Sequence, residues 1–346
     1  MPRSGLCNPL TAVRVAASMT AMDYPATDAD MVLAGHVTPA RALSGFAVER
    51  GGILPGSDAA AFNLLRPHEP AIPILLTVSH AGRTYPPEVT AQMREPDQAA
   101  LTLEDRLMDR IGEMIAAETG AALLIAEAPR AMIDLNRAPD DIDWGMVAGE
   151  RFGRTAHSAG NRRARAGLGL VPRRLARLGE VWSQPLRSDQ LKARLAGIHV
   201  PFHEVLTRTL TDLRDRWGAA LLIDLHSMPP LSSGVQENAP LVLGDRFGAS
   251  LGRELASFSV EFLSRSRRVA HNLPYAGGYI AERHGAPRFG VHAVQLEVCR
   301  ATYLDAAMRS LGSRHAMLAR HLTEYVRAIA DEVIWMGRSR PRWAAE

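Results

Sequence analysis

The sequence predicts an α/β fold, a three-layer α/β/α sandwich around a mixed β-sheet. Three short apolar runs, at residues 72–80, 219–227 and 291–298, are typical of buried strands. Segments with the apolar spacing of amphipathic helices alternate with these runs, and further short strands lie between them. This alternation, without an internal repeat, favours helices on both faces of one sheet.

The beginning of the chain differs from the rest. Residues 1–45 are rich in alanine, threonine and methionine and show no sustained periodicity. Asp23, Asp28 and Asp30 come early and no apolar core forms, so the segment lacks the pattern of a signal peptide. We predict a loosely ordered extension over residues 1–45, followed by a single folded domain over residues 46–346.

The first long helix is predicted over residues 101–119. Its apolar residues recur every four positions and are Leu103, Leu107, Ile111 and Ile115. Gly120 supplies a stop, because glycine readily adopts the left-handed conformation that ends many helices. Strands are predicted to follow at residues 121–126 and 131–135.

The rest of the chain is predicted to contain a surface excursion and several further helices. Residues 143–185 contain glycine, arginine and proline and are interpreted as a long excursion over the surface. A pair of helices, interrupted near Pro201, is predicted over residues 191–217, and a further helix over residues 247–263. One or two closing helices are expected over residues 305–334.

Composition excludes several classes of protein. Hydrophobic residues make up 47% of the 346 residues, but no apolar run reaches the roughly 18 residues that span a membrane. Cys7 and Cys299 are the only cysteines, which argues against a disulfide framework and fits a reducing cytoplasm. The net charge is only +3, and the basic stretch at residues 162–174 lacks interleaved aromatic residues, so no nucleic-acid partner is expected.

Histidines and acids stand at the ends of the apolar runs. His80 closes the first run and His226 lies near the end of the second. Asp224 lies two residues before His226, on the same side of the strand, where a carboxylate can orient a metal-bound imidazole. Glu297 lies inside the third run, where an unpaired carboxylate is costly to bury. We therefore expect Glu297 to be a general base.

A third metal ligand is sought near the predicted helix over residues 101–119. Glu104 and Asp105 stand at its beginning, although carboxylates there are also favoured by the helix dipole. Two histidines and a carboxylate at the carboxyl ends of neighbouring strands predict a zinc hydrolase site, because catalytic zinc uses three protein ligands and one open position.

Basic residues near the same ends predict a substrate that is itself acidic. Arg130 and the pair Asn136-Arg137 could hold an anion, since a guanidinium binds a carboxylate through two parallel hydrogen bonds. Residues 272–287 contain two glycine-rich turns and are expected to form a mobile loop over the site.

Together, eight ordered motifs resemble the N-formylglutamate amidohydrolase family, which is related to the zinc carboxypeptidases and aspartoacylase. The resemblance covers about residues 46–334, and its motifs are Ser79-His80-Ala81-Gly82, Glu104-Asp105-Arg106, Arg130 with Ile133-Asp134-Leu135-Asn136-Arg137, Gly167-Leu168-Gly169-Leu170-Val171-Pro172-Arg173, His199-Val200-Pro201-Phe202-His203, Asp224-Leu225-His226-Ser227-Met228-Pro229, Pro274-Tyr275-Ala276-Gly277-Gly278-Tyr279, and Gln295-Leu296-Glu297 with Tyr303-Leu304-Asp305. It implies a phosphorylase/hydrolase-like fold, one zinc ion, and hydrolysis of N-formyl-L-glutamate late in histidine degradation.

The resemblance also implies roles for individual residues. The zinc ligands would be His80, His226 and either Asp105 or Glu104, with Glu297 as the base that activates water. Asn136 and Arg137 would hold a substrate carboxylate. Independently of the resemblance, the chemistry of the reaction makes Arg130 the expected partner of the oxyanion. Arg173, Tyr279 and Arg283 are further predicted substrate-binding residues.

The sequence departs from the familiar family pattern after Gly278-Tyr279. Ala281-Glu282 stands where a Thr-Arg pair is usual, and Arg283 follows one place later. Two alternatives stay open. One is a zinc hydrolase of another N-acyl amino acid or of a small carboxylate-bearing amide, and the other is a catalytically silent binding protein. The sequence does not predict an oligomeric state.

Overall fold

The computed structural model describes residues 43, 45–152, 162–231 and 239–339. The predicted extension over residues 1–45 lies outside this part of the chain, apart from Leu43 and Gly45. Within it, none of the helices is both long and apolar enough to cross a membrane.

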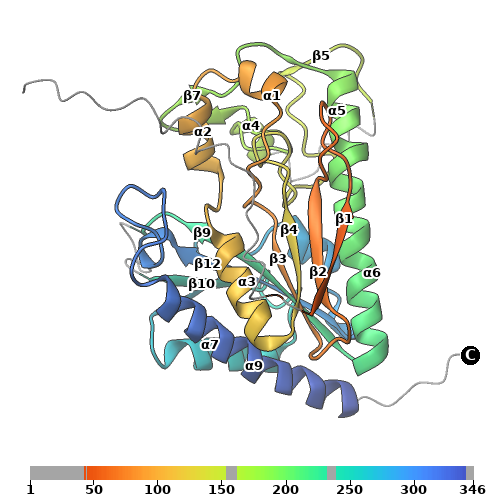
Figure 1. Cartoon of the computed structure of the whole chain (residues 1–346), viewed down its shortest axis with the longest axis vertical. Helices are drawn as coiled ribbons and strands as arrows, with labels where there is room; N and C mark the ends of the chain where they lie inside the picture. Colours follow the sequence, from red (N-terminus) through yellow and green to blue (C-terminus); the bar gives the residue numbers. More distant parts are fainter. Residues whose placement is uncertain (1–42, 44, 153–161, 232–238, 340–346) are drawn as a thin grey trace, which may run out of the picture. The chain divides into compact units, whose positions relative to one another are not determined.

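An eight-stranded mixed sheet forms the centre of the fold (Figure 1). Its strands, in spatial order, are β1 (Phe46–Gly51), β2 (Phe62–Pro67), β4 (Ala122–Ala126), β3 (Ile74–Val78), β9 (Ala220–Met228), β12 (Val291–Cys299), β10 (Leu241–Gly244) and β11 (Val269–His271). The central strands β4, β3, β9 and β12 run parallel, whereas β2 and β10 pair antiparallel to their neighbours β4 and β12. The prediction of a mixed sheet is confirmed.

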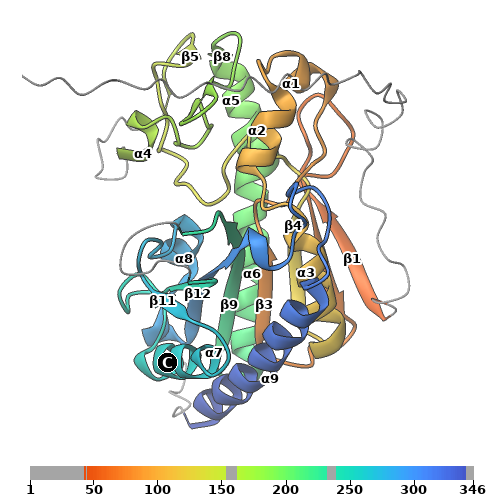
Figure 2. The same ribbon diagram turned by 90° about the vertical axis from the view of Figure 1, so that its left-hand side faces the viewer.

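Helices cover both faces of this sheet, as predicted (Figure 2). One face packs against α3 (Met108–Thr119), α7 (Arg253–Ser264) and α9 (His315–Ser339), and the other against α6 (Val200–Trp217) and α8 (Tyr279–His284). Alternate residues of β9 divide between the two layers: Leu221 and Ile223 join the α3 core, and Leu222 joins the α6 core. Every residue of β9 is buried, which explains its nearly continuous apolar sequence.

Shorter elements complete the described chain. The helices are α1 (Pro87–Ala91), α2 (Pro96–Leu103), α4 (Arg162–Arg165), α5 (Ser188–Arg194), a π-helix (Leu195–His199) and two 3-10 turns (Pro287–Phe289 and Arg300–Thr302). The two-residue strands β5 (Val147–Ala148), β6 (Arg174–Leu175), β7 (Gly179–Glu180) and β8 (Leu186–Arg187) form two small separate sheets. The predicted excursion over residues 143–185 is therefore largely irregular where it is described.

The prediction of one helix over residues 101–119 is wrong. Helix α2 ends at Leu103, where Glu104 turns to an extended conformation, and Leu107 adopts a left-handed conformation with φ of 59° before α3 begins. The break lets the backbone N–H of Asp105 donate to the carbonyl of His80 at 2.9 Å. Leu103 of α2 and Ile111 of α3 are both buried, so the apolar spacing continues across the break. The sequence pattern therefore does not reveal where α2 ends.

The predicted strand at residues 131–135 is also absent. Met132 donates to the carbonyl of Pro129, and Asp134 donates to the carbonyl of Leu170, so the segment is a buried turn and not part of the sheet. Its apolar residues are fully buried, and burial alone gives a loop the composition of a strand.

The later helices differ from their predictions mainly at their ends. Residues 188–217 form a continuous run in which the π-helix precedes Pro201 in the first turn of α6. Proline leaves a carbonyl without its helical donor, and Gly197 instead accepts from the backbone of Ile53 at 2.8 Å. Helix α7 begins only at Arg253, and the closing segment is one helix, α9.

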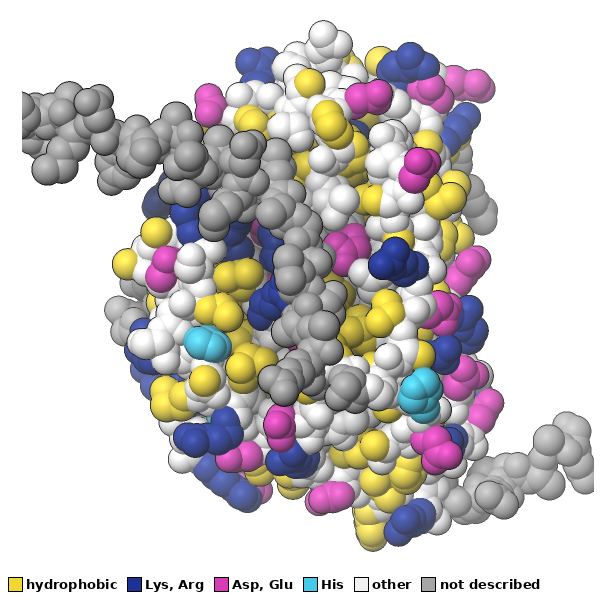
Figure 3. All heavy atoms as spheres, in the orientation of Figure 1, with side chains coloured by type: hydrophobic (Ala, Val, Ile, Leu, Met, Phe, Trp, Pro, Cys, Tyr) yellow, Lys and Arg dark blue, Asp and Glu magenta, His cyan; other side chains and the backbone are white. Residues whose placement is uncertain are grey.

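The surface carries both signs of charge. Acidic and basic side chains are interspersed on the face that Figure 3 shows. As far as this face belongs to the described residues, it bears no extended patch of one sign.

Candidate active site

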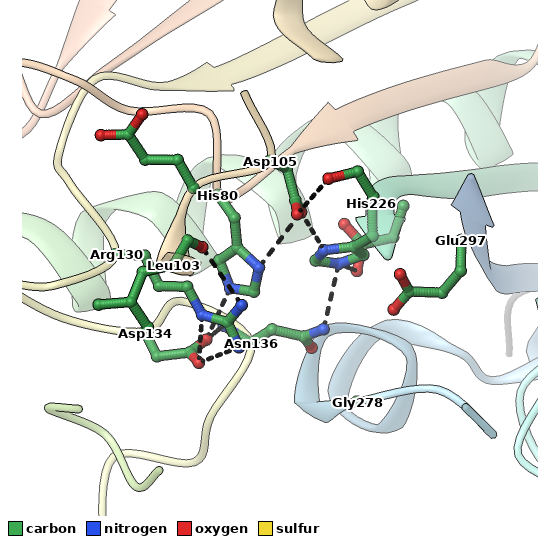
Figure 4. A network of polar contacts seen from close by, with 12 residues as sticks. His80, Leu103, Asp105, Arg130, Asp134, Asn136, His226, Gly278 and Glu297 are labelled. Carbon is green, nitrogen blue, oxygen red and sulfur yellow. Dashed lines mark hydrogen bonds and ion pairs between the residues drawn. The ribbon is translucent and has the colours of Figure 1, made fainter. Parts of the chain in front are cut away.

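Neighbouring parallel strands bring the predicted histidines and Glu297 together (Figure 4). His80 lies two residues beyond the end of β3, and His226 and Glu297 lie near the ends of β9 and β12. Because β3, β9 and β12 are adjacent and parallel, their carboxyl ends meet at one edge of the sheet. In the register of β9 and β12, His226 is paired directly with Glu297.

His80, Asp105 and His226 form a group that could hold a metal ion. One ligand atom from each lies within 4.8 Å of the other two, and all three side chains are buried. The two imidazole rings have centroids 4.6 Å apart. This group is the only candidate metal site of its kind among the residues that the structure describes.

Two further carboxylates orient the imidazole rings through their Nε2 atoms. Asp134 Oδ1 lies 2.7 Å from His80 Nε2, and Asp224 Oδ2 lies 2.7 Å from His226 Nε2. A carboxylate at Nε2 favours the proton there and leaves the Nδ1 lone pair for a metal. Both Nδ1 atoms face Asp105 Oδ2, at 3.5 Å from His80 and 2.8 Å from His226. The donor set therefore fits a zinc ion.

Charges in this group stabilise one another in the absence of a cation. Burial lowers the pKa of His226, but Asp224 and Asp105 more than offset it and raise that pKa well above its usual range. Burial likewise raises the pKa of Asp105, and the hydrogen bond from His226, assisted by the nearby His80, reverses the effect and holds it well below the usual value. The Nδ1 of His80 has no hydrogen-bond partner among the described residues, as expected for a nitrogen that faces an ion site.

Glu297 stands beside the group without belonging to it. Its Oε1 accepts a hydrogen bond of 2.8 Å from Gln295 Nε2, and burial raises its pKa although His226 opposes the shift. A carboxylate with a raised pKa is a stronger proton acceptor than an ordinary one. Its geometry is therefore suited to a general base.

A cavity of about 170 Å³ lies over these residues. Among the described residues, its ionisable lining comprises His80, Asp105, His226, Tyr275, Glu297 and four arginines, Arg130, Arg137, Arg163 and Arg300. Guanidinium groups therefore outnumber carboxylates in the lining, a composition suited to a small acidic molecule.

Two of these arginines are anchored by the segment that follows β4. Arg130 pairs with Asp134 through Nε at 3.0 Å and through its second terminal nitrogen at 2.9 Å. Arg137 donates through Nε to the carbonyl of Leu168 at 3.1 Å and to the carbonyl of Asn136 at 2.9 Å. These bonds fix the planes of both guanidinium groups at the cavity wall.

Asn136 is held by the protein itself. Its Oδ1 accepts from the backbone N–H of Ile280 at 2.8 Å, and its Nδ2 donates to Gln295 Oε1 at 3.1 Å and lies 3.2 Å from His226 Nε2. The amide also packs against Gly278, where an added Cβ would lie 2.4 Å from Asn136 Oδ1. Asn136 thereby links the cavity wall to α8. The segment over residues 272–287, predicted as a loop, contains this helix.

The remaining sequence-predicted residues lie outside the cavity lining. Glu104 accepts from Tyr85 at 3.0 Å and from Arg106 at 3.1 Å, so Asp105 and not Glu104 faces the histidines. Arg173 pairs with Asp143 at 3.1 Å and with Glu180 at 3.0 Å.

Tyr279 and Arg283, on α8, contact each other at 2.9 Å. Ala281 is buried, and Glu282 pairs with Arg246 at 3.2 Å. The negative charge at the place where the sequence departs from the family pattern is therefore directed away from the cavity lining.

Arg300 is a cavity residue to which the sequence analysis gave no role. It donates to Ser227 Oγ at 3.0 Å and to the carbonyl of Glu104 at 2.6 Å, and it lies 3.6 Å from Asp105 Oδ1. Ser227 itself donates to Asp105 Oδ1 at 2.8 Å. Its place in the sequence was the one indication of a role, because Arg300 follows directly after strand β12, which carries Glu297.

Comparison with known proteins identifies the family. A model of the N-formylglutamate amidohydrolase family matches residues 72–304. The chain belongs to this family. The match spans both histidines, Asp105, Glu297 and the four arginines of the cavity.

Relatives in the N-formylglutamate amidohydrolase family cover most of the chain. An N-formylglutamate deformylase of Pseudomonas aeruginosa is 29% identical over 276 residues, which are 78% of this chain and 95% of the relative. A protein of the same name from Pseudomonas putida is 30% identical over 246 residues, covering 69% of this chain and 84% of the relative.

A solved structure supports the fold assignment. The crystal structure of an N-formylglutamate amidohydrolase from Ralstonia eutropha has a TM-score of 0.72 and 28% identity, with 79% of this chain and 98% of that chain covered. A protein from Agrobacterium tumefaciens, 18% identical, has the same fold with a TM-score of 0.56 and coverage of 79% and 96%.

Proposed function

We propose that the protein is a zinc-dependent amidohydrolase that cleaves N-formyl-L-glutamate to glutamate and formate. The observation that carries the proposal is the buried His80–Asp105–His226 group, with Glu297 beside it in a small, arginine-lined cavity. The names of the Pseudomonas relatives support the choice of substrate. We further propose that the reaction takes place in the cytoplasm, which the scarcity of cysteines supports, and late in histidine degradation, as the family resemblance implies.

His80, Asp105 and His226 would hold the zinc ion. Three protein ligands leave one position open for water or substrate, which distinguishes catalytic from structural zinc sites. Zinc bound there would polarise the formyl carbonyl and lower the pKa of a water molecule toward about 7. Asp134 and Asp224 would keep both imidazoles in the metal-binding tautomer.

Glu297 would move the proton. Gln295 holds Oε1, so Oε2 would accept the proton of the attacking water and then deliver it to the departing amine of glutamate. Its raised pKa, caused by burial, makes Glu297 a stronger proton acceptor in the first transfer than an ordinary carboxylate would be.

The arginines would bind and stabilise negative charge. Arg130, fixed by Asp134, would face the oxygen that becomes negative as the carbonyl is attacked. Arg137 would bind a substrate carboxylate through its planar fork. The substrate carries two carboxylates, and the excess of guanidinium groups in the cavity fits that charge.

The test combines metal analysis with a comparison of substrates. The purified protein should contain one zinc per chain, release formate from N-formyl-L-glutamate, lose activity on chelation and regain it with zinc. N-formyl-L-aspartate and N-acetyl-L-glutamate serve as competing substrates, because they alter the acid chain and the acyl group separately. Faster turnover of either would replace the proposed substrate, and full activity after complete removal of metal would exclude the zinc mechanism.

A further inference from the structure

Four aromatic rings form a cluster behind the cavity wall. His199 ends the π-helix, His203 lies on α6, and Tyr279 and His284 lie on α8. The centroid of His203 is 4.4 Å from that of His199, 5.1 Å from Tyr279 and 5.2 Å from His284. None of the three histidines lines the cavity or belongs to the candidate metal group, so the proposed mechanism does not use them.

Two of these histidines bond to the backbone of the cavity wall. His203 Nε2 lies 3.0 Å from the carbonyl oxygen of Leu135, and His199 Nε2 lies 2.9 Å from that of Arg137. A carbonyl oxygen only accepts hydrogen bonds, so both Nε2 atoms carry protons and donate. The two carbonyls flank Asn136, and the histidines therefore hold the turn on both sides of it.

The proton positions follow from one residue to the next. Because His203 donates through Nε2, a neutral His203 accepts through Nδ1, and His284 Nε2 donates to it at 2.9 Å. Burial, assisted by the neighbouring imidazoles and Arg283, lowers the pKa of His203 to about 2. Burial, assisted by Arg283, lowers that of His284 to about 3. Both rings are neutral at physiological pH, so the directions of these hydrogen bonds are fixed.

The turn that they hold carries three parts of the site. Asp134 accepts the backbone N–H of Asn136 at 2.9 Å through Oδ1, the same oxygen that lies 2.7 Å from His80. Arg137 follows Asn136 directly and lines the cavity. Movement of this turn would therefore change the position of Asp134 against His80 and that of Arg137 against the substrate.

We propose that His199 and His203 are positioning residues that act through the carbonyls of Leu135 and Arg137. They set the turn at residues 134–137, and through it both the orientation of His80 and the place of the Arg137 guanidinium. The positioning of the turn stands on its own hydrogen bonds, whereas the expected effects on zinc and substrate rest on the proposed function.

Paired substitutions separate hydrogen bonding from packing. His203→Leu removes the donor to Leu135 and keeps an apolar side chain, whereas His203→Gln can place an amide N–H near the same carbonyl. His292→Leu is the matched control, because His292 is equally buried, accepts from Gly252 at 3.2 Å and lies at the opposite end of β12 from Glu297. Circular dichroism and thermal unfolding confirm that each variant is folded.

Hydrogen exchange of the peptide containing residues 131–140 is the direct measurement. We expect His203→Leu to speed exchange there by about tenfold or more, and we expect no local change in His203→Gln or His292→Leu. In the same variant, KM for N-formyl-L-glutamate should rise and zinc affinity should fall, because the turn carries Arg137 and Asp134. The fall in affinity should stay below the roughly 10- to 100-fold that loss of a direct outer-shell partner such as Asp134 costs.

The outcomes are distinguishable. Exchange in this peptide that is no faster in His203→Leu than in His292→Leu would overturn the positioning role, as would a glutamine variant that behaves like leucine. If the wild type neither binds zinc nor releases formate while the exchange pattern appears as expected, the proposed function fails and the positioning role stands.

Discussion

Glu297 and His226 are direct register partners on the parallel strands β12 and β9. Neighbouring strands lie about 4.8 Å apart, and both side chains point to the same face of the sheet. The proposed base and a proposed zinc ligand are therefore spaced by backbone hydrogen bonds of two fully buried strands. A site on such rigid elements keeps its geometry when a single side chain is changed, which makes substitutions informative.

Glu297→Gln should retain zinc and fold normally while kcat falls by about 10²- to 10⁴-fold, the usual contribution of a general base. Glutamine has the same shape, opens no cavity and removes a buried carboxylate. Metal content by atomic spectrometry and formate release measure the two effects. Loss of zinc would make Glu297 a ligand, and retention of full activity would exclude the mechanism.

Arg137→Lys should raise KM for N-formyl-L-glutamate by about tenfold or more, because the ammonium loses at least one charge-assisted hydrogen bond of the planar fork. Steady-state kinetics measures the change. Arg173→Lys is the matched control, since Arg173 contacts Asp143 and Glu180 outside the cavity lining. Equal effects of the two substitutions would remove Arg137 from the substrate-binding role.

Asp134→Asn and Asp224→Asn should each weaken zinc binding by about 10- to 100-fold, because both carboxylates orient proposed ligands. Competition with a chromophoric chelator measures the affinity. Asp245→Asn provides the control, since Asp245 is also buried at the end of a sheet strand but contacts His271 and Asn272. Unchanged affinity in the first two variants would contradict the orienting role.

Acid should destabilise the fold through His203 and His284. Their folded-state pKa values are about 2 and about 3, against an unfolded value of 6.5, so the unfolded chain binds more protons below pH 6.5. Each histidine then costs about 1.4 kcal/mol of unfolding free energy per pH unit between that pH and its folded pKa. The groups that face the pair are His199, Tyr279 and Arg283, and none supplies a negative charge that would stabilise the imidazolium.

Denaturant unfolding of the wild type and of the double variant His203→Gln/His284→Gln at pH 7.5 and pH 5 tests this expectation. The wild type should lose more stability than the variant as the pH falls, because the variant lacks both titrations. A difference between the two proteins that does not change with pH would refute it.

The features that were predictable from the sequence are those that a single run of residues contains. Apolar runs that carry His80, His226 and Glu297 at or near their ends predicted buried strands with chemistry at one edge, since parallel strands align their carboxyl ends. The break at Leu107 could not be predicted, because the apolar residues on its two sides keep a helical spacing although Leu103 and Ile111 pack into different cores.

Contacts between residues far apart in the sequence also could not be predicted from local sequence patterns. Asp134 and His80 are 54 residues apart, and Asp105 and His226 are 121 apart, yet each pair is in hydrogen-bond contact. The role of Arg300 depends on the same kind of contact, with Ser227 on another strand. Sequence spacing supplies the residue types at such sites, and only the sheet topology supplies the partners.

The proposed ligand set has a consequence for how the protein matures. Its three residues come from the end of β3, the connection between α2 and α3, and β9, so they meet only after β3 and β9 have paired. The cores on both faces of the sheet consist of apolar side chains that need no ion to pack. The chain would therefore fold before it captures metal, and a cell short of zinc would accumulate an intact but idle protein rather than lose it to degradation.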